Sequence, residues 1–382
     1  MRRTSKTSDC GIYIHVPFCV RKCSYCDFYS VPVKDEMVPA DYITAVSREI
    51  EREAKRWQDK TFVSIYFGGG TPSLLSGTQI RDWFKTLTGR VNLAAGAEIS
   101  LEANPATLTR DKIKAYQDLG INRISLGVQS FADPDLAVLG RIHRQYQVYG
   151  AISDLTAQGF KNFNIDLIYG VPGQTMAGWL MNLAQTVDCR PAHISLYLLQ
   201  LEPNTDLGRK VGLGQVKLLD ESLESDLYYE SIEFLTRNGF RHYEISNWAL
   251  PGKESRHNLF YWTGSDYWGL GAGAVSFREN IRYMNQEDHI AYCREDYPVR
   301  DIMETMSDAD LVSDAVILGL RLCSGIDLSA FKQRFGVDIL TAYSAAMVKH
   351  IEQGLLEIQD NCVRLTKKGY FLSNQVFYDF IT

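Results

Sequence analysis

The sequence contains no run of about 18 apolar residues, the length that a helix needs to cross a membrane. Its first residues are basic but no apolar core follows them, so we expect no secretory signal. The formal net charge of −6 argues against the broad basic surface that general nucleic-acid binding requires. We therefore expect no nucleic-acid partner and no membrane span, while peripheral contact with a membrane stays open.

A disulfide framework is also missing, because most of the eight cysteines are scattered singly along the chain. The isolated thiols are Cys10, Cys189, Cys293, Cys323 and Cys362. Unpaired thiols of this kind fit a reducing cytoplasm, which is the expected location. The length suggests one large domain or two ordinary ones, and it is compatible with a monomer or a homodimer.

Three further cysteines stand close together, at Cys19, Cys23 and Cys26. Thiolates bind soft metals and iron–sulfur clusters. Three neighbouring cysteines can hold three irons of a four-iron cluster and leave the fourth iron open to a small molecule. The alternative is a zinc site completed by His15 or Asp27, but such sites more often show two separated Cys-x2-Cys pairs. The sequence has no second pair.

Six short apolar stretches alternate with helix-like stretches in the first half of the chain. The predicted strands are 11–16, 61–67, 98–103, 122–128, 162–168 and 193–199. Helices are expected near 40–57, from about 77, near 109–119, up to about 158 and near 174–188. Successive βα units require a parallel sheet with right-handed crossovers. A closed eight-fold barrel needs two more units, so we predict an α/β fold with an incomplete parallel (β/α)6 barrel.

Polar or unusual residues follow the C-terminal ends of these predicted strands. The cysteines follow the first strand, and the others are Gly68 to Gly70, Glu102, Gln129, Asp166, Gln200 and Glu202. Parallel βα proteins place their chemistry at this end of the sheet. Each residue alone fits a cap or a loop, and the glycines alone fit a tight turn. Together they predict one functional site.

The second half of the chain opens with a predicted helix at 220–238 and a strand at 240–245, after which His257 stands beside several large aromatic residues. An imidazole can ligate haem iron, and aromatic rings can stack on a macrocycle. The alternative is a packed aromatic core containing a hydrogen-bonded histidine. Both interpretations stay open from these residues alone.

Residues 306–382 are predicted to form a small separate module. We expect helices at 310–321, 327–335 and 338–353, then a hairpin turning at Asp360 and Asn361, then a final helix. This order is that of a winged-helix-like module, and without a basic surplus it favours packing or partner docking over DNA binding. The predicted divisions are a partial barrel at 1–215, an accessory region at 216–305 and the C-terminal module at 306–382.

The Cys-x3-Cys-x2-Cys pattern at 19–26 resembles the signature of the radical S-adenosylmethionine (SAM) superfamily. Three further stretches, 67–72, 127–131 and 166–174, are similar to the oxygen-independent coproporphyrinogen III oxidase group. Within this group the chain resembles the HemW-type branch of haem chaperones, which shares the His-Asn-x-x-Tyr-Trp motif at 257–262. Phe28 stands where the oxidases carry a further cysteine, and a shorter stretch than theirs precedes the first predicted strand.

The resemblance implies a [4Fe–4S] cluster on Cys19, Cys23 and Cys26, with SAM on the open iron. It assigns the SAM pocket to Tyr13, Tyr25, Gly69, Gly70, Thr71, Glu102, Gln129, Arg141, Asp166 and Gln200. It assigns haem binding to His257, Asn258, Tyr261 and Trp262.

The expected function is that of a cytoplasmic haem chaperone that hands haem to acceptor haem proteins, with respiratory proteins among the candidates. Whether the chain is also an enzyme is left open by the resemblance. One rival is a coproporphyrinogen III oxidase that abstracts hydrogen from propionate side chains through a 5′-deoxyadenosyl radical. The others are a haem-degrading radical SAM methyltransferase and a zinc-stabilised scaffold.

Overall fold

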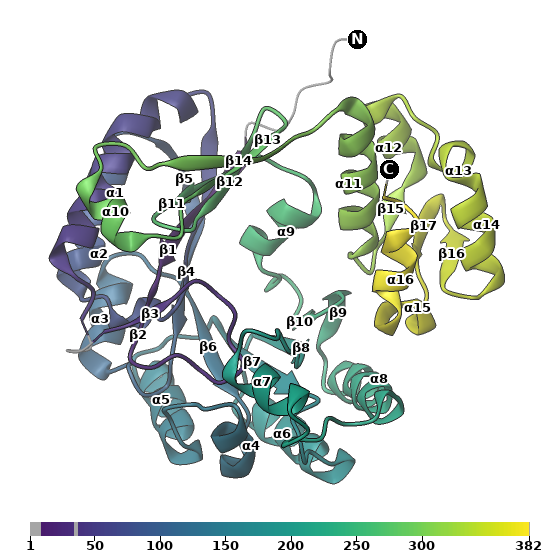
Figure 1. Ribbon diagram of the computed structural model, residues 1–382, viewed down its shortest axis with the longest axis horizontal. Helices are drawn as coiled ribbons and strands as arrows, with labels where there is room; N and C mark the ends of the chain where they lie inside the picture. Colours follow the sequence, from purple (N-terminus) through teal and green to yellow (C-terminus); the bar gives the residue numbers. More distant parts are fainter. Residues whose placement is uncertain (1–8, 34–36, 382) are drawn as a thin grey trace.

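Twelve strands form one mixed sheet in the order β14-β13-β12-β11-β1-β4-β5-β6-β7-β8-β10-β9. The protein is represented by a computed structural model, which describes residues 9–33 and 37–381. The six central strands run parallel, namely β1 (Asp9–Val16), β4 (Thr61–Gly69), β5 (Asn92–Ala103), β6 (Arg123–Gln129), β7 (Phe163–Tyr169) and β8 (His193–Leu198). The strands that the structure describes curve without closing (Figure 1), which confirms the predicted incomplete barrel.

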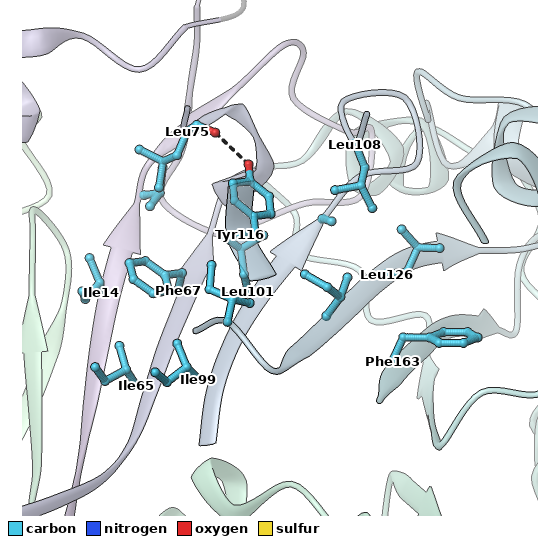
Figure 2. Close-up of a cluster of buried hydrophobic side chains, with 14 of the residues drawn as sticks. Ile14, Ile65, Phe67, Leu75, Ile99, Leu101, Leu108, Tyr116, Leu126 and Phe163 are labelled. Atoms are coloured by element: carbon cyan, nitrogen blue, oxygen red, sulfur yellow. Dashed lines mark hydrogen bonds between the residues drawn. The ribbon is translucent and has the colours of Figure 1, made fainter. Parts of the chain in front are cut away.

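Side chains alternate along these strands between two environments. On β4, Ile65 and Phe67 join the apolar core, whereas Ser64 and Tyr66 point to the opposite, concave face. Figure 2 shows the outward set, which includes Ile14, Leu101 and Leu126 from neighbouring strands. Parallel strands covered by helices on both faces are apolar throughout. The alternation here follows from a helix layer on one face only.

Crossover helices cover the convex face (Figure 1). They are α1 (Ala40–Glu53), α2 (Gly77–Thr88), α3 (Arg110–Asp118), α4 (Asp133–Val138), α5 (Gln145–Ala157) and α6 (Met176–Asp188). Ser76, Thr109 and Thr175 cap three of them by accepting hydrogen bonds from first-turn amides. Buried Tyr116 on α3 donates its hydroxyl hydrogen to the Leu75 carbonyl at 2.7 Å (Figure 2), so its polar group is satisfied within this layer.

The middle region extends the sheet at both edges. After α7 (Asp206–Gly212) and α8 (Glu221–Arg237), the strand β10 (Asn247–Ala249) pairs antiparallel with β8, and β9 (Arg241–Glu244) pairs antiparallel with β10 at the edge. At the other edge β11 (Tyr267–Leu270) pairs parallel with β1, followed by β12 (Val275–Arg278), β13 (Ile281–Asn285) and β14 (Arg300–Thr305). The strand β11 was not predicted, because its aromatic residues were interpreted only as a possible ligand wall.

A buried carboxylate holds this second extension against the helix layer. Glu49 of α1 accepts hydrogen bonds from the Gly271 amide at 2.9 Å, Asn285 at 2.9 Å, Tyr292 at 2.6 Å and Arg300 at 3.0 Å. A buried charge is tolerated only when it is paired and hydrogen-bonded in this way. The short helix α10 (His289–Arg294) carries Tyr292 and packs beside α1.

The C-terminal module has a core of its own around Val316, Leu320 and Phe380. Its helices are α11 (Asp308–Leu320), α12 (Leu328–Phe335), α13 (Ile339–Ala342), α14 (Ser344–Glu352), α15 (Lys367–Phe371) and α16 (Ser373–Tyr378). A small sheet joins β15 (Ile326–Asp327), β17 (Cys362–Leu365) and β16 (Leu356–Gln359). The expected winged-helix-like order is confirmed.

Two details of the module differ from the prediction. The single helix expected at 338–353 is broken at Tyr343, whose φ of −116° and ψ of 34° are not helical, and the final helix is likewise broken at Leu372. The hairpin turn was predicted correctly, since Asp360 and Asn361 both take positive φ as a tight two-residue turn requires. Among the described residues, no helix combines the length and the apolar character that a membrane crossing needs.

The outward layer predicts a specific loss of stability. Leu101→Ala is expected to lower the free energy of unfolding by about 2–5 kcal/mol, because the fully buried side chain leaves a cavity between sheet and helices. The control Leu213→Ala removes the same atoms from a side chain that is 73% exposed and should change this free energy by less than about 0.5 kcal/mol. Denaturant titration measures both. Equal losses would contradict the assignment of the core to this face.

Candidate functional site

A cavity of about 1580 Å³ lies on the concave side of the sheet. It is lined by residues from the C-terminal ends of β4 to β8, from the cysteine loop and from the C-terminal module. Pockets for a single drug-sized ligand measure about 300–1,000 Å³. This cavity therefore has room for two ligands of moderate size.

The loop that carries the three cysteines is closed at its base by a small parallel pair of strands, β2 (Phe18–Cys19) and β3 (Val31–Pro32). Its tip is tied to the loop after α4, because the Ser24 amide donates to the Leu139 carbonyl at 3.1 Å and the Ser24 hydroxyl donates to the Val138 carbonyl at 2.7 Å. Cys19, Cys23 and Cys26 are partly exposed and all line the cavity. The backbone thus fixes three sulfurs on one wall.

Two of the sulfurs accept hydrogen bonds from residues outside the loop. Thr71 donates to the sulfur of Cys19 at 3.4 Å, and the Arg141 guanidinium donates to that of Cys23 at 3.3 Å. Burial raises the pKa of Cys19, and it raises the pKa of Cys26 to about 11. These thiols keep their protons until a metal displaces them.

The residues proposed as a fourth zinc ligand are otherwise engaged. The two ring nitrogens of His15 lie 2.9 Å from the Tyr13 hydroxyl and 3.1 Å from the Tyr29 carbonyl, and Asp27 accepts a hydrogen bond from Asn204. Over residues 9–33 and 37–381 no three His, Cys, Asp or Glu side chains converge on the position of a single ion. His15 and Asp27 thus each already have a protein partner.

The glycines at the C-terminal end of β4 allow a close approach to the cysteine loop. Gly69 has a φ of +112°, and a Cβ there would lie 2.6 Å from the His15 ring. A Cβ at Gly70 would lie 2.6 Å from the Phe18 carbonyl oxygen and 3.0 Å from the Cys19 sulfur. The segment therefore forms a tight turn whose glycines let its backbone pack against the cysteine loop.

A buried carboxylate stands beside the glycines. Glu102 accepts hydrogen bonds from the Tyr66 hydroxyl at 2.8 Å and from the Gly69 amide at 3.1 Å. Burial, assisted by the charge of Asp166, raises the pKa of Glu102 to about 7. Burial also raises the pKa of Asp166, although Ser125 donates a hydrogen bond to it. Two carboxyl groups whose pKa values are raised by burial thus line the cavity.

Unsatisfied polar atoms mark the same wall. The side-chain oxygen of Gln129 is buried without a hydrogen-bond partner among the described residues, and so is the Nε of Arg141. Gln129 also takes a φ of 68°, which is costly for a residue other than glycine. Unpaired buried groups and local strain together are typical of a ligand site. The wall fits a polar ligand that carries amine, carboxylate and hydroxyl groups.

The His-Asn-x-x-Tyr-Trp motif forms the short helix α9 (Arg256–Trp262) on the concave side (Figure 1). Ser255 caps this helix, and Glu98 of β5 accepts hydrogen bonds from the backbone amides of Arg256 and His257. The sheet therefore fixes the start of the helix. Asn258, Tyr261 and Trp262 line the cavity.

His257 itself lies behind this wall, with 2% of its surface exposed. One ring nitrogen lies 2.9 Å from the Ser64 hydroxyl and the other lies 2.9 Å from the Tyr261 hydroxyl. Burial lowers the pKa of His257 to about 3, so the ring is neutral. Its role as a haem ligand stays a prediction, and it requires the ring to give up one of these two hydrogen bonds.

The structure brings most of the predicted site residues together. Lining the one cavity are Cys19, Cys23, Tyr25, Cys26, Gly69, Gly70, Thr71, Glu102, Gln129, Arg141, Asp166, Gln200, Asn258, Tyr261 and Trp262. Tyr13 instead lines a neighbouring pocket of about 290 Å³, together with His15, Tyr29 and Tyr261.

Sequence reasoning missed a row of buried polar residues that also line the cavity, which consists of Ser125, Asn164, His193 and Ser195. These residues are linked, since His193 shares a hydrogen bond with Asn164 at 2.8 Å and Asn164 donates to Ser125 at 2.7 Å. The signal that could have found them is the alternation of apolar and polar residues within the strands that were predicted.

Comparison with known proteins shows which families this chain resembles. A family model for the radical SAM superfamily matches residues 13–183, and one for the HemN C-terminal domain matches residues 306–372. A protein of Lactococcus lactis named heme chaperone HemW is 35% identical, aligned over 97% of this chain and 96% of its own length. The heme chaperone HemW of Escherichia coli is 40% identical over 69% of each chain.

Among solved structures, coproporphyrinogen III oxidase (HemN) of Escherichia coli, a radical SAM enzyme, superposes with a TM-score of 0.84. The match covers 99% of this chain and 90% of the other, at 23% identity, so it shows a shared fold. The extent of the HemW matches, together with a cysteine loop that lines one cavity with α9, places this chain in the HemW family of the radical SAM superfamily.

Proposed function

We propose that this protein is a haem chaperone of the cytoplasm, which binds haem in the concave cavity and hands it to acceptor haem proteins. Its HemW relatives bear the name heme chaperone. The observation that carries the proposal is the arrangement of one cavity, whose wall includes the cysteine loop and the exposed face of the α9 motif. A chaperone of this kind needs a site that holds haem without enclosing it.

Cys19, Cys23 and Cys26 would hold a [4Fe–4S] cluster, and exchangeable SAM would occupy the wall beside it. The unsatisfied atoms of Gln129 and Arg141 suit its polar groups, and so do the carboxyl groups of Glu102 and Asp166, each of which accepts a hydrogen bond from a hydroxyl. When bound, the cluster supplies one-electron chemistry at a sulfonium centre. The residues of this chain orient the ligand, and the helix layer keeps water from the convex side.

Haem would lie against the aromatic face of α9. The indole of Trp262 and the ring of Tyr261 offer flat apolar surfaces, and the neutral ring of His257 stands directly behind Tyr261. A histidine held by two hydrogen bonds is a weaker competitor for iron than a free one. Haem bound in this way can pass to an acceptor that offers better ligation.

The first test follows haem from this protein to an apo-acceptor such as an apo-cytochrome b. The cluster-loaded wild type should bind haem and release it to the acceptor, and His257→Ala should bind haem about tenfold more weakly. Because His257→Ala could loosen α9, Ser64→Ala serves as a second variant. It frees one ring nitrogen and should bind haem at least as tightly as the wild type.

The control His289→Ala alters a histidine that shares a hydrogen bond with Tyr29 and does not line the cavity, so haem binding should not change. Absorbance titration measures haem binding, and acceptor spectra measure transfer. A wild type that holds haem but never releases it to any acceptor would refute the chaperone assignment. Unchanged binding by His257→Ala would place the iron ligand elsewhere.

The second test uses the pKa of Glu102, which is about 7. This pKa is raised above the ordinary carboxyl value, so Glu102 becomes charged only as the pH rises through 7. The charged form accepts hydrogen bonds and attracts the sulfonium more strongly. SAM affinity should therefore increase by up to about tenfold from pH 6 to pH 8. Equilibrium dialysis at fixed ionic strength measures it.

Glu102→Gln should bind SAM with an affinity that is nearly independent of pH over this range. The control Glu202→Gln removes a carboxyl group that also lines the cavity but is exposed, and it should keep the slope of the wild type. A slope that persists in Glu102→Gln would show that another group titrates.

A further inference from the structure

The end of the cavity away from the cysteine loop is built by three parts of the chain that are distant in sequence. They are β9 and its turn, the last residue of α9, and the C-terminal module. The wall there includes Tyr228, Glu244, Trp262, Arg321, Tyr370 and Phe371. Four aromatic rings and one cation thus line this part of the cavity.

The backbone around Arg321 is fixed by the sheet. The Arg321 carbonyl accepts a hydrogen bond from the Ile245 amide at 3.2 Å, and the Cys323 amide donates to the Tyr243 carbonyl at 3.0 Å. Between them, Glu244 and Leu322 form an antiparallel bridge. The turn after α11 therefore pairs with β9 and directs the Arg321 side chain to the cavity wall.

The Arg321 guanidinium uses only part of its binding capacity. It lies 4.2 Å above the ring of Trp262. Its nearest carboxylate oxygen, on Glu244, is 3.7 Å away, which is beyond a hydrogen bond. The Nε of Arg321 and this oxygen of Glu244 are both buried without a hydrogen-bond partner among the described residues.

The other cationic side chains of the cavity wall contact other groups or belong to the cysteine loop. Arg21 donates to two backbone carbonyls of the loop after α4, and Arg141 contacts the Cys23 sulfur. Arg123 donates to the Lys253 carbonyl, and Lys22 belongs to the cysteine loop. Within the part of the chain that the structure describes, Arg321 is the one cavity-lining cation of the C-terminal module.

We propose that Arg321 binds a propionate carboxylate of haem whose ring lies against Trp262, so that the C-terminal module forms part of the haem site. This inference rests on the proposed function. Haem is a flat aromatic molecule with two carboxylates at one edge, and the wall offers aromatic rings, one of which carries a single guanidinium over one face. An arginine can bind a carboxylate through two parallel hydrogen bonds.

Glu244 lies near Arg321 and helps to orient it. It does not use all of the N–H donors of Arg321, so some stay available for a ligand. Its side chain is fully buried, and its other oxygen accepts hydrogen bonds from the Ser246 amide and from Asn247. Burial raises the pKa of Glu244, which weakens its charge and its hold on Arg321. An incoming carboxylate therefore competes with a long, incomplete ion pair.

The test compares haem with its dimethyl ester, in which both propionates are neutral. Full-length, cluster-loaded protein is titrated with each ligand, and the ratio of the two dissociation constants is measured. The wild type should bind haem about tenfold more tightly than the ester. In Arg321→Gln the ratio should approach one, through a loss of haem affinity with ester affinity unchanged, and Arg321→Lys should lie between.

Two further variants separate binding from folding. Arg256→Gln removes a cation of α9 that donates to the Gly96 carbonyl and does not line the cavity, and the ratio should stay that of the wild type. Glu244→Gln removes the competing charge, so the ratio should increase. A purely structural Arg321–Glu244 pair predicts instead that both substitutions weaken haem and ester equally.

SAM also carries a carboxylate, so SAM binding is measured in parallel. It should be unchanged in Arg321→Gln, and a selective loss of SAM affinity would overturn the assignment to haem. A wild type that binds neither haem nor ester would refute the proposed function, and this inference with it. If the wild type binds haem and Arg321→Gln prefers haem over the dimethyl ester as strongly as the wild type does, this inference is refuted and the proposed function is not.

Discussion

Six parallel strands carry all their crossover helices on one face, and the rest of the molecule depends on this asymmetry. Outward side chains such as Ile65 and Leu101 can be apolar because α1 to α6 cover them. Inward side chains such as Tyr66 and Asp166 face a cavity instead. A closed barrel of this size fills its interior with side chains. An open sheet leaves that volume for ligands.

The later parts of the chain make this open sheet a defined site. The Glu49 cluster fastens β11 to β14 beside β1, and β9 with β10 completes the opposite edge. The α9 helix then lies on the concave face and the C-terminal module docks on β9. These additions narrow the opening, and they bring the motif at 257–262 to the same cavity as the cysteine loop.

Local sequence patterns were sufficient for the parallel strands and for the residues at their C-terminal ends. Each strand is a short apolar stretch, and the chain direction alone decides which end carries Glu102 or Gln129. The strand β11 could not be predicted in this way, because it pairs with β1 across more than half of the chain, as Tyr267 opposite Gly11 shows. The break at Tyr343 likewise depends on the packing of the module.

The sequence predicted the parts of the candidate site that are defined by the spacing of neighbouring residues. It did not predict the parts that depend on contacts between residues distant in the sequence. The cysteine pattern directly marked a loop that the structure places on the cavity wall. The burial of His257 between Ser64 and Tyr261 involves a partner nearly two hundred residues away, so the motif alone could not show it. The contact between Arg321 and Trp262 joins two regions that no local sequence pattern links.

The central claim is that three sulfurs on the cavity wall hold an iron–sulfur cluster with one iron open to SAM. Iron and acid-labile sulfide analysis of protein purified without oxygen, combined with electron paramagnetic resonance of the reduced form with and without SAM, tests it most directly. The account predicts about four irons and four sulfides per chain and a spectrum that SAM changes. Cys19→Ser should lose both properties and Cys293→Ser should keep them. Colourless wild-type protein without iron or sulfide would contradict the account.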